Sequence, residues 1–468
     1  MYINAPISAI FLLSWQSSRA DLPIHCLVSE MVGDWIFKIS EPMSKPEDCR
    51  AHQDGAKFVN DVRVQLDSGR TERSQLVANA YQLTNTGNLV GAQSSVSWAP
   101  IYDEGLIVRY QKDNKWITLY GQFKYVRDRS VVSSSAEVQE DGTTPGYISQ
   151  CGTIFRGWVI SETTPGDSQK SISCMIASKV ESTGSNSVRG SVQPHQQTSA
   201  NEPRAQISIP DTLPLPANHI AYSPSDVQQP KCGSCYVYSF AYALERSFEK
   251  RLTSLVGRPV DQVRLDRQVM LSCAYSSEGC DGGYFESLTL DMSVRGIPIA
   301  QNQQSSDPAV TSCPLQRLGN QNALYFPKSF ISLQSEQEIK ESILSNGPVL
   351  VGVYMDQHDQ TNPLAVLNLR RAPKSPQTGE WDYLNHGIVL IGWDRQGTDT
   401  YWIAYNSWGM VQRIQMGGES EWIYKYAVSI VPDLCRGAPL RTLIQAIGNE
   451  EEAKRRAGCE SAIGRARS

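Results

Sequence analysis

Residues 229–240 read Q-P-K-C-G-S-C-Y-V-Y-S-F, and this stretch decides how the rest of the chain is interpreted. Cys235 stands just before apolar residues at helical spacing, namely Val237, Phe240, Ala241, Leu244 and Phe248. The pattern predicts a helix that begins at Cys235. A helix N-terminus favours a thiolate over a thiol, and a thiolate is a strong nucleophile. We therefore predict that Cys235 is a catalytic nucleophile and that the Gln229 side chain donates to the oxyanion it creates.

A thiolate nucleophile also needs a base, for which histidine is the usual residue. The chain has six histidines, which are His25, His52, His195, His219, His358 and His386. His386 alone lies in a strand-like context, N-H-G-I-V-L-I-G-W at residues 385–393. We therefore take His386 as the candidate base.

A second strand-like run, T-Y-W-I-A-Y-N-S-W, occupies residues 400–408 after a turn-rich hexapeptide. A hairpin folded about Gln396 and Gly397 brings His386 within one register step of Asn406. Cross-strand Cβ atoms lie roughly 5 Å apart, so the Asn406 oxygen can fix the tautomer of the imidazole. Cysteine, histidine and asparagine then form a thiol-protease triad.

Four short blocks occur in this order: C-G-S-C at 232–235, G-C-D-G-G at 279–283, N-H-G at 385–387 and Y-N-S-W-G at 405–409. Over roughly residues 222–445 the chain resembles the papain family of cysteine proteases, which also separates its cysteine and histidine by roughly 150 residues. The resemblance implies an α+β domain with a helical lobe and a β-barrel-like lobe. It also implies that Gly282 and Gly283 line the substrate site and that Trp408 shields the histidine from solvent.

The N-terminal part carries a second resemblance. Residues 21–35, D-L-P-I-H-C-L-V-S-E-M-V-G-D-W, are similar to the start of the exclusion domain of the cathepsin C (dipeptidyl peptidase I) family, and Tyr236 after the nucleophile fits that family too. Short alternating runs between turn signals independently indicate an antiparallel β-barrel. The resemblance implies a dipeptidyl aminopeptidase in which the carboxylate of Asp21, exposed as the new N-terminus, binds the substrate's α-amino group.

The chain divides into five expected segments. They are a signal peptide at 1–20, the exclusion domain at 21–177, a Ser-, Gly- and Pro-rich linker at 178–214, the peptidase domain at 215–445 and a charged tail at 446–468. The linker stands where the family has an inhibitory propeptide.

Eleven cysteines suit an oxidising compartment, and an odd count leaves at least one thiol unpaired, for which Cys235 is the candidate. The resemblance implies the disulfides Cys26–Cys151, Cys49–Cys174, Cys232–Cys280 and Cys273–Cys313. Cys435 and Cys459 remain, and the sequence leaves open whether they pair. A C-x-x-C block such as C-G-S-C can also be a redox pair or bind zinc. The chain has no second cysteine pair at metal-binding spacing, so no metal is expected.

The composition limits the classes of partner that we expect. Net charge is −5 with 19% charged residues, so no basic surface for nucleic acid is expected, and no later segment predicts a membrane span. We expect peptide substrates with a free N-terminus, a lysosome-like, vacuolar or extracellular location, and, by resemblance, a homotetramer. The family binds chloride through tyrosines. Glu286 and Asp356 stand at those positions, so chloride is at most an optional ligand here, and no cofactor is expected to be required.

Two other functions stay open. One is an endopeptidase that keeps the papain chemistry. The other is a catalytically weak secreted binding protein on the same fold. The second is favoured by residues 410–424, which replace the family's usual W-G-E-N-G-Y run, and is opposed by the intact Cys235, His386, Asn406 and Gln229.

Overall fold

The structure is a computed structural model of the 468-residue chain. It describes residues 26–43, 49, 58–67, 85–89, 95–101, 104–127, 147–163, 170–180, 208–213, 232–275, 277, 279–300, 313–314, 318–355, 366–367, 369, 371–374 and 384–459. The expected signal peptide, Asp21, Gln229 and Asp356 lie outside the described residues.

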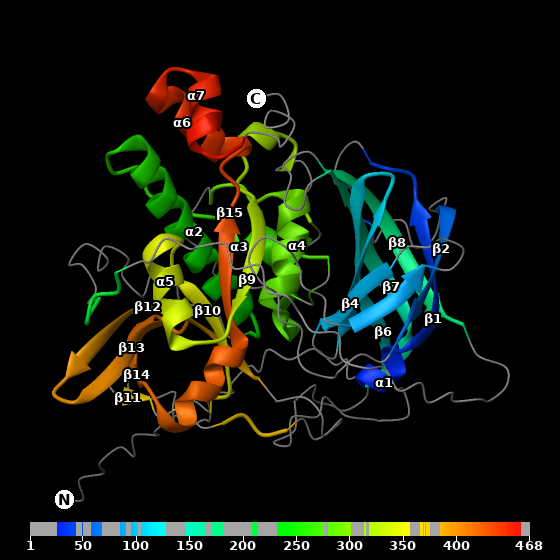
Figure 1. Ribbon diagram of the computed structural model, residues 1–468, viewed down its shortest axis with the longest axis horizontal. Helices are drawn as coiled ribbons and strands as arrows, with labels where there is room; N and C mark the ends of the chain where they lie inside the picture. The colour runs from blue at the N-terminus through cyan, green and yellow to red at the C-terminus, as the bar shows by residue number, and fades with distance from the viewer. Residues whose placement is uncertain are drawn as a thin grey trace, which may run out of the picture.

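The N-terminal half is a closed antiparallel β-barrel, as predicted (Figure 1). The short helix α1 (Val28–Met31) precedes β1 (Gly33–Ser40), β2 (Phe58–Leu66), β3 (Asn85–Leu89), β4 (Ser95–Ile101), β5 (Gly105–Lys112), β6 (Lys115–Arg127), β7 (Tyr147–Glu162) and β8 (Ser171–Lys179). The barrel closes because β1 pairs with both β2 and β8.

Both faces of several barrel strands are buried. Side chains alternate along a strand, so Leu106, Val108 and Tyr110 of β5 pack inside the barrel with Trp35. Ile107 of the same strand points outward and joins a hydrophobic cluster that contains helices of the C-terminal half. One outer face of the barrel is therefore packed against the rest of the molecule.

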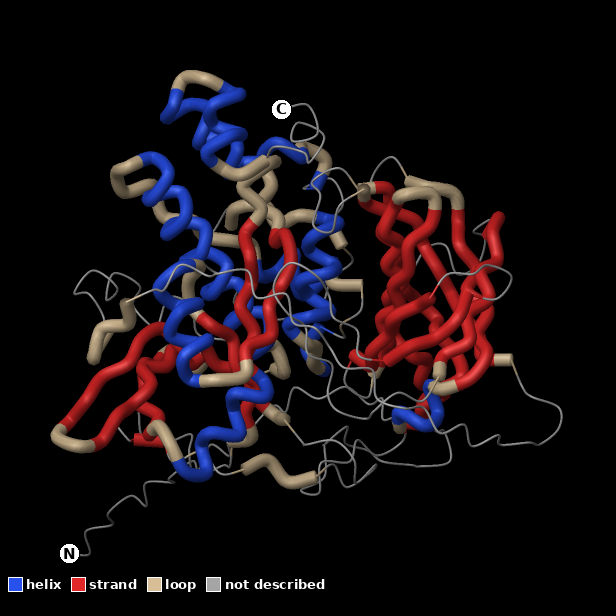
Figure 2. The backbone as a smooth tube through the Cα atoms, in the orientation of Figure 1, coloured by secondary structure: helices blue, strands red, loops and turns tan. Residues whose placement is uncertain are grey.

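The C-terminal half combines helices with a seven-stranded sheet, in the strand order β11-β14-β13-β12-β10-β15-β9. Its helices are α2 (Cys235–Val256), α3 (Arg267–Cys273), α4 (Phe285–Arg295), α5 (Glu336–Ser345), α6 (Gly437–Ile447) and α7 (Glu450–Arg456), with 3-10 turns η4 (Gly279–Asp281), η6 (Gln321–Ala323) and η8 (Gly418–Tyr426). Its strands are β9 (Pro327–Leu333), β10 (Val349–Val353), β11 (Val366–Leu367), β12 (His386–Gln396), β13 (Asp399–Asn406), β14 (Met410–Gln415) and β15 (Ala427–Pro432). Figure 2 shows the helices concentrated in this half and the strands forming the barrel. The α+β architecture agrees with the prediction.

Helix α2 packs against one face of this sheet. Leu350 of β10 and Val389 of β12 join the cluster that contains α2, whereas Val349 and Ile388 join a second cluster on the opposite face. The sheet therefore presents one end of β12 beside the first turn of α2.

Two segment boundaries differ from the expectation. Within the expected linker, Leu213 pairs with Trp393 of β12, and the Trp393 indole N–H donates to the Pro210 carbonyl at 3.1 Å. Helix α6 continues to Ile447, past residue 445 where the peptidase domain was expected to end, because its apolar face packs on α2.

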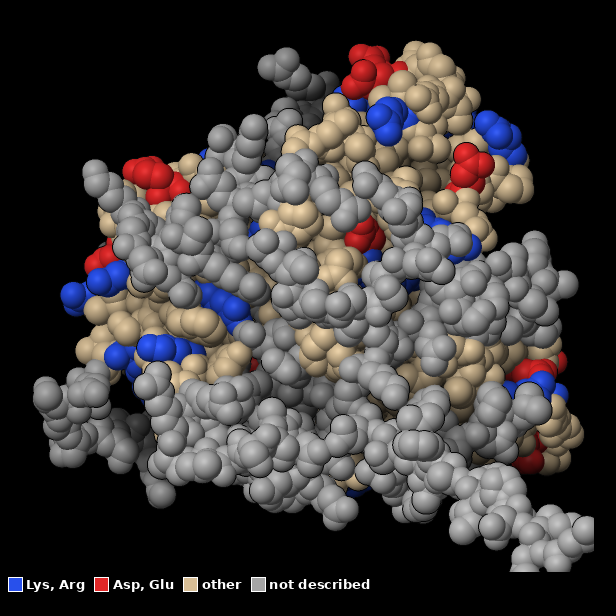
Figure 3. Space-filling view, turned by 180° about the vertical axis from the view of Figure 1, so that it is seen from behind, with Lys and Arg blue, Asp and Glu red and all other residues tan. Residues whose placement is uncertain are grey.

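Acidic and basic side chains of the described residues lie interspersed on the face drawn in Figure 3. On α7, for example, Lys454 pairs with Glu450, and Arg455 and Arg456 pair with Glu452. Across the ranges that the structure describes, no helix combines the length and apolar character needed to cross a bilayer.

Candidate active site

Cys235 is the first residue of α2, as the apolar spacing predicted. Ser234 is the N-cap and the Cys235 side chain is 3% exposed. Burial raises the pKa of the Cys235 thiol, and hydrogen bonding from the backbone of Gly387, Tyr236 and Cys235 itself opposes that rise. Because a thiolate accepts such bonds more strongly than a thiol, these three contacts favour the nucleophilic form.

Disulfides hold the chain on either side of this cysteine. The structure contains all four pairings that the resemblance implied, and it adds a fifth, Cys435–Cys459, which joins the start of α6 to the end of α7. Cys235 is the cysteine that stays outside a disulfide. The Gly233 N–H also donates to the Cys280 carbonyl at 2.7 Å, so residues 232–234 are fixed before the helix begins.

His386 begins β12 and lies against the first turns of α2. The Ser239 hydroxyl, one turn after Cys235, donates to the Gly387 carbonyl at 2.8 Å. A Cβ on Gly387 would come within 2.8 Å of the Phe285 ring, so glycine permits close packing of β12 against α4. The Ser239 hydrogen bond and this packing place the histidine, whose side chain is buried.

The hairpin brings His386 and Asn406 together, but in a different register from the one predicted. Asn406 pairs with Ile388, two residues from His386, because the turn lies at Gly397 and Thr398 and a bulge intervenes between Leu390 and Gly392. Residues 386 and 388 share a face of the strand, so the diagonal contact still forms. His386 Nε2 lies 2.9 Å from Asn406 Oδ1.

These contacts determine the tautomer of the histidine. The Trp408 backbone N–H can only donate, and it lies 3.2 Å from the Asn406 side-chain atom assigned as oxygen. His386 Nε2 faces the same oxygen, so Nε2 carries a proton and donates it. Nδ1 then holds the lone pair that can accept the thiol proton.

Trp408 covers the histidine. The two rings are stacked with centroids 4.2 Å apart and planes tilted by 24°. This stacking places Trp408 beside the His386–Asn406 hydrogen bond, and the shielding role that the resemblance implied stays a prediction.

Gln412 on β14 is a functional residue that the sequence did not reveal. Its Oε1 accepts from Asn406 Nδ2 at 2.8 Å, and the side chain is 2% exposed. This bond holds the Asn406 amide with its oxygen toward His386. The usual family motif after Asn406 is missing, so sequence comparison gave no reason to select residue 412, although an amide six residues beyond Asn406 could have been noticed.

Gln412→Met removes this acceptor at similar side-chain length. We expect kcat to fall by roughly tenfold to a hundredfold with little change in KM, because an unpaired buried N–H costs about 1–3 kcal/mol and lets the amide turn. Steady-state kinetics on a fluorogenic peptide test this, with Gln412→Glu, which keeps an acceptor oxygen, as the comparison. A wild-type kcat in Gln412→Met contradicts the orienting role.

Burial opposes the charged form of Cys235 and the charged form of His386. It raises the pKa of Cys235 to about 11, against the backbone hydrogen bonds, and it lowers the pKa of His386 to about 4, against the bond to Asn406. Opposite charges formed together stabilise each other, so the thiolate and the imidazolium are expected to appear as a pair rather than singly.

The two glycines differ in their surroundings. Gly282 has a φ of +129°, which favours glycine. A Cβ on Gly283 would come within 2.7 Å of both Ser277 Oγ and the Tyr236 ring. Gly283 therefore permits close packing beside the nucleophile helix, and a role in substrate contact stays a prediction for both residues.

No group of three His, Cys, Asp or Glu side chains in the described parts of the chain is arranged to hold a metal ion.

Comparison with known proteins gives two family matches. Residues 219–418 match "Papain family cysteine protease" and residues 21–179 match "Cathepsin C exclusion domain". Cathepsin S of Bos taurus is 27% identical over 188 residues, covering 39% of this chain and 51% of that protein. Dipeptidyl aminopeptidase 1 of Plasmodium falciparum is 24% identical over 295 residues, covering 44% of this chain and 42% of that protein. The chain thus spans about half the length of such curated relatives.

Among solved structures, digestive procathepsin L 3 of Tenebrio molitor larval midgut matches with a TM-score of 0.35 and 20% identity, over 44% of this chain and 65% of that one.

Proposed function

Because this chain joins a papain-family cysteine protease domain to a cathepsin C exclusion domain, we propose that it is a cysteine-type dipeptidyl aminopeptidase. It would remove dipeptides from the free N-terminus of peptides and proteins. The proposal rests on three observations in one chain: Cys235 begins α2, the His386–Asn406 hydrogen bond lies on a strand joined to α2 through Ser239 and Gly387, and a barrel packs against the same domain.

The proposed reaction uses the contacts described above. The Cys235 proton passes to His386 Nδ1, and the thiolate attacks the scissile carbonyl. The Cys235 backbone N–H and the Gln229 side chain stabilise the oxyanion. His386 then protonates the leaving amine, and water hydrolyses the thioester. Asn406 and Gln412 keep the imidazole oriented through both steps.

In this proposal, the barrel makes the enzyme selective for peptides with a free N-terminus. Asp21 is five residues before Cys26, which is fully buried and joined by a disulfide to Cys151 of β7. As an exposed N-terminal residue, Asp21 would pair its carboxylate with the ammonium group of a substrate and block longer peptides. Five disulfides suit a secretory, lysosome-like or extracellular compartment.

The test compares a dipeptide amide with a free amine and its N-acetylated form on the purified protein. A dipeptidyl aminopeptidase cleaves the first and spares the second. Equal cleavage of both substrates supports the endopeptidase instead, and cleavage of neither supports the binding protein.

Asp21→Asn tests the recognition of the amine. We expect cleavage of the free-amine substrate to fall by tens-fold, since a charge-assisted hydrogen bond contributes about 1.5–3 kcal/mol. Alkylation of Cys235 by a small reagent should stay unchanged. Sequencing of the mature N-terminus comes first, and a mature chain that begins after residue 21 contradicts this role.

A further inference from the structure

Asp291 on α4 is a fully buried aspartate that connects the two halves of the chain. Its Oδ1 accepts from the Tyr120 hydroxyl at 2.8 Å and from the Trp158 indole N–H at 2.7 Å, and both donors belong to the barrel. Its Oδ2 accepts from the Tyr275 backbone N–H at 2.7 Å within the protease half. One side chain therefore bonds both halves at once.

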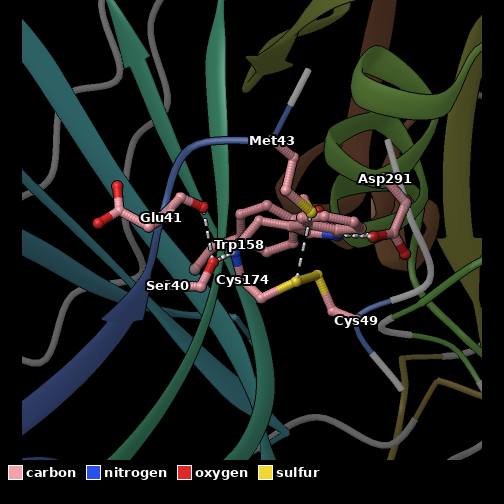
Figure 4. The surroundings of a disulfide bond; sticks show 8 residues. Ser40, Glu41, Met43, Cys49, Trp158, Cys174 and Asp291 are labelled. Carbon is pink, nitrogen blue, oxygen red and sulfur yellow. Dashed lines mark hydrogen bonds between the residues drawn. A yellow bond between two sulfur atoms is a disulfide. The ribbon is translucent and has the colours of Figure 1, made fainter. Parts of the chain in front are cut away.

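The barrel presents these two donors as a rigid pair. Tyr120 of β6 and Trp158 of β7 are direct cross-strand partners on the outer face. On its other side Trp158 pairs with Cys174 of β8, whose disulfide to Cys49 lies beside the indole (Figure 4). The donors cannot shift without moving three strands of the barrel.

The surroundings of Asp291 favour a single docked position. Arg295, one turn later on α4, lies 5.3 Å from the Trp158 ring centre. Burial and the neighbouring Asp291 raise the pKa of Tyr120 well above its usual value, so the hydroxyl stays protonated and donates throughout the physiological range. A buried carboxylate is costly unless its hydrogen bonds are complete, so displacement of the barrel is disfavoured.

Two covalent links connect this contact with the substrate site. On the barrel side, β7 carries both Trp158 and Cys151, and Cys151 is joined by a disulfide to Cys26, five residues after Asp21 in the sequence. On the protease side, the segment after Tyr275 reaches Cys280, which is joined to Cys232 beside the nucleophile.

We propose that Asp291 is a positioning residue that sets the distance between the barrel and Cys235, and thereby the preference for substrates with a free amino terminus. The proposal rests on the proposed function. Without the Asp291 contacts, the apolar packing between the barrel and the protease half remains, but the hydrogen bonds that fix one relative position are lost. A shift of the barrel would then carry Cys26 with it, because the Cys26–Cys151 disulfide joins that residue to β7. The catalytic residues keep their own contacts.

Two changes break the contact from opposite sides. Asp291→Ala removes the acceptor, and the double variant Tyr120→Phe with Trp158→Phe removes the two donors while leaving the protease half intact. Asp266→Asn is the control, because Asp266 is another buried aspartate that caps α3 through Val269 within the protease half. The readout is the ratio of kcat/KM for the free-amine substrate to that for its N-acetylated form.

We expect this ratio to fall by about tenfold or more in both test variants, since a misplacement of about 1 Å can cost a hundredfold. Alkylation of Cys235 should stay at the wild-type rate, and Asp266→Asn should keep the wild-type ratio. A wild-type ratio in the double variant, with folding retained, overturns the inference alone. A wild-type protein that cleaves both substrates equally overturns the proposed function and the inference with it.

Discussion

Cys235→Ala is expected to abolish peptide hydrolysis. Removal of the nucleophile from a catalytic triad costs on the order of 10⁶ in kcat, because the remaining groups can only assist attack by water. Cys235→Ser should be nearly as inactive, since burial that raises the pKa of a thiol penalises an alkoxide as well. Hydrolysis of a free-amine dipeptide substrate and labelling by an epoxide thiol inhibitor measure the effect.

Folding should survive this change. Cys235 lies outside the five disulfides, and the Ser239–Gly387 contact that joins α2 to β12 does not involve its side chain. Thermal unfolding of the variant, compared with that of the wild type, provides the control. Near-wild-type hydrolysis in Cys235→Ala would remove the basis for a cysteine peptidase. A wild type as slow as the variant would point to the binding protein.

The sequence predicted the parts of the site that depend on local patterns. The apolar spacing after Cys235 requires a helix that begins there, and the two strand-like runs around Gly397 can form only a hairpin. His386 and Asn406 lie on those runs, so their contact followed from the chain itself. The barrel followed in the same way from alternating strands.

The register within the hairpin could not be read from the pattern. The bulge between Leu390 and Gly392 shifts the pairing by one residue, and it occurs where the Leu213 carbonyl would come within 2.4 Å of a Cβ at Gly392. That neighbour comes from a segment almost 180 residues earlier in the chain. Local spacing carries no information about such a contact.

The residues that the sequence did not reveal act through long-range contacts. Asp291 looks like an ordinary helix residue until its donors on β6 and β7 are known. Gln412 sits where the family's usual motif is absent, and its role appears once β14 is paired with β13. Asp21 and Gln229 lie outside the described residues, so their roles stay predictions.

His386→Ala should remove nearly all activity and also change how Cys235 responds to pH. Without the imidazole, nothing accepts the thiol proton and nothing protonates the leaving amine, so the loss should exceed that of Gln412→Met by a wide margin. What remains at Cys235 is a buried thiol with three backbone hydrogen bonds. Its reaction with iodoacetamide reports the thiolate directly.

The sign of the pH effect follows from the pKa of about 11 that burial gives Cys235. Below that pH the thiol keeps its proton, so in His386→Ala we expect alkylation to be slow at neutral pH and to rise about tenfold per pH unit in the alkaline range. In the wild type, the paired imidazolium stabilises the thiolate, so alkylation should already be fast near pH 7. Iodoacetamide rates measured from pH 5 to 10 in both proteins distinguish the two profiles. Identical profiles would mean that His386 does not share a proton with Cys235, and the assignment of His386 as the base would then be wrong.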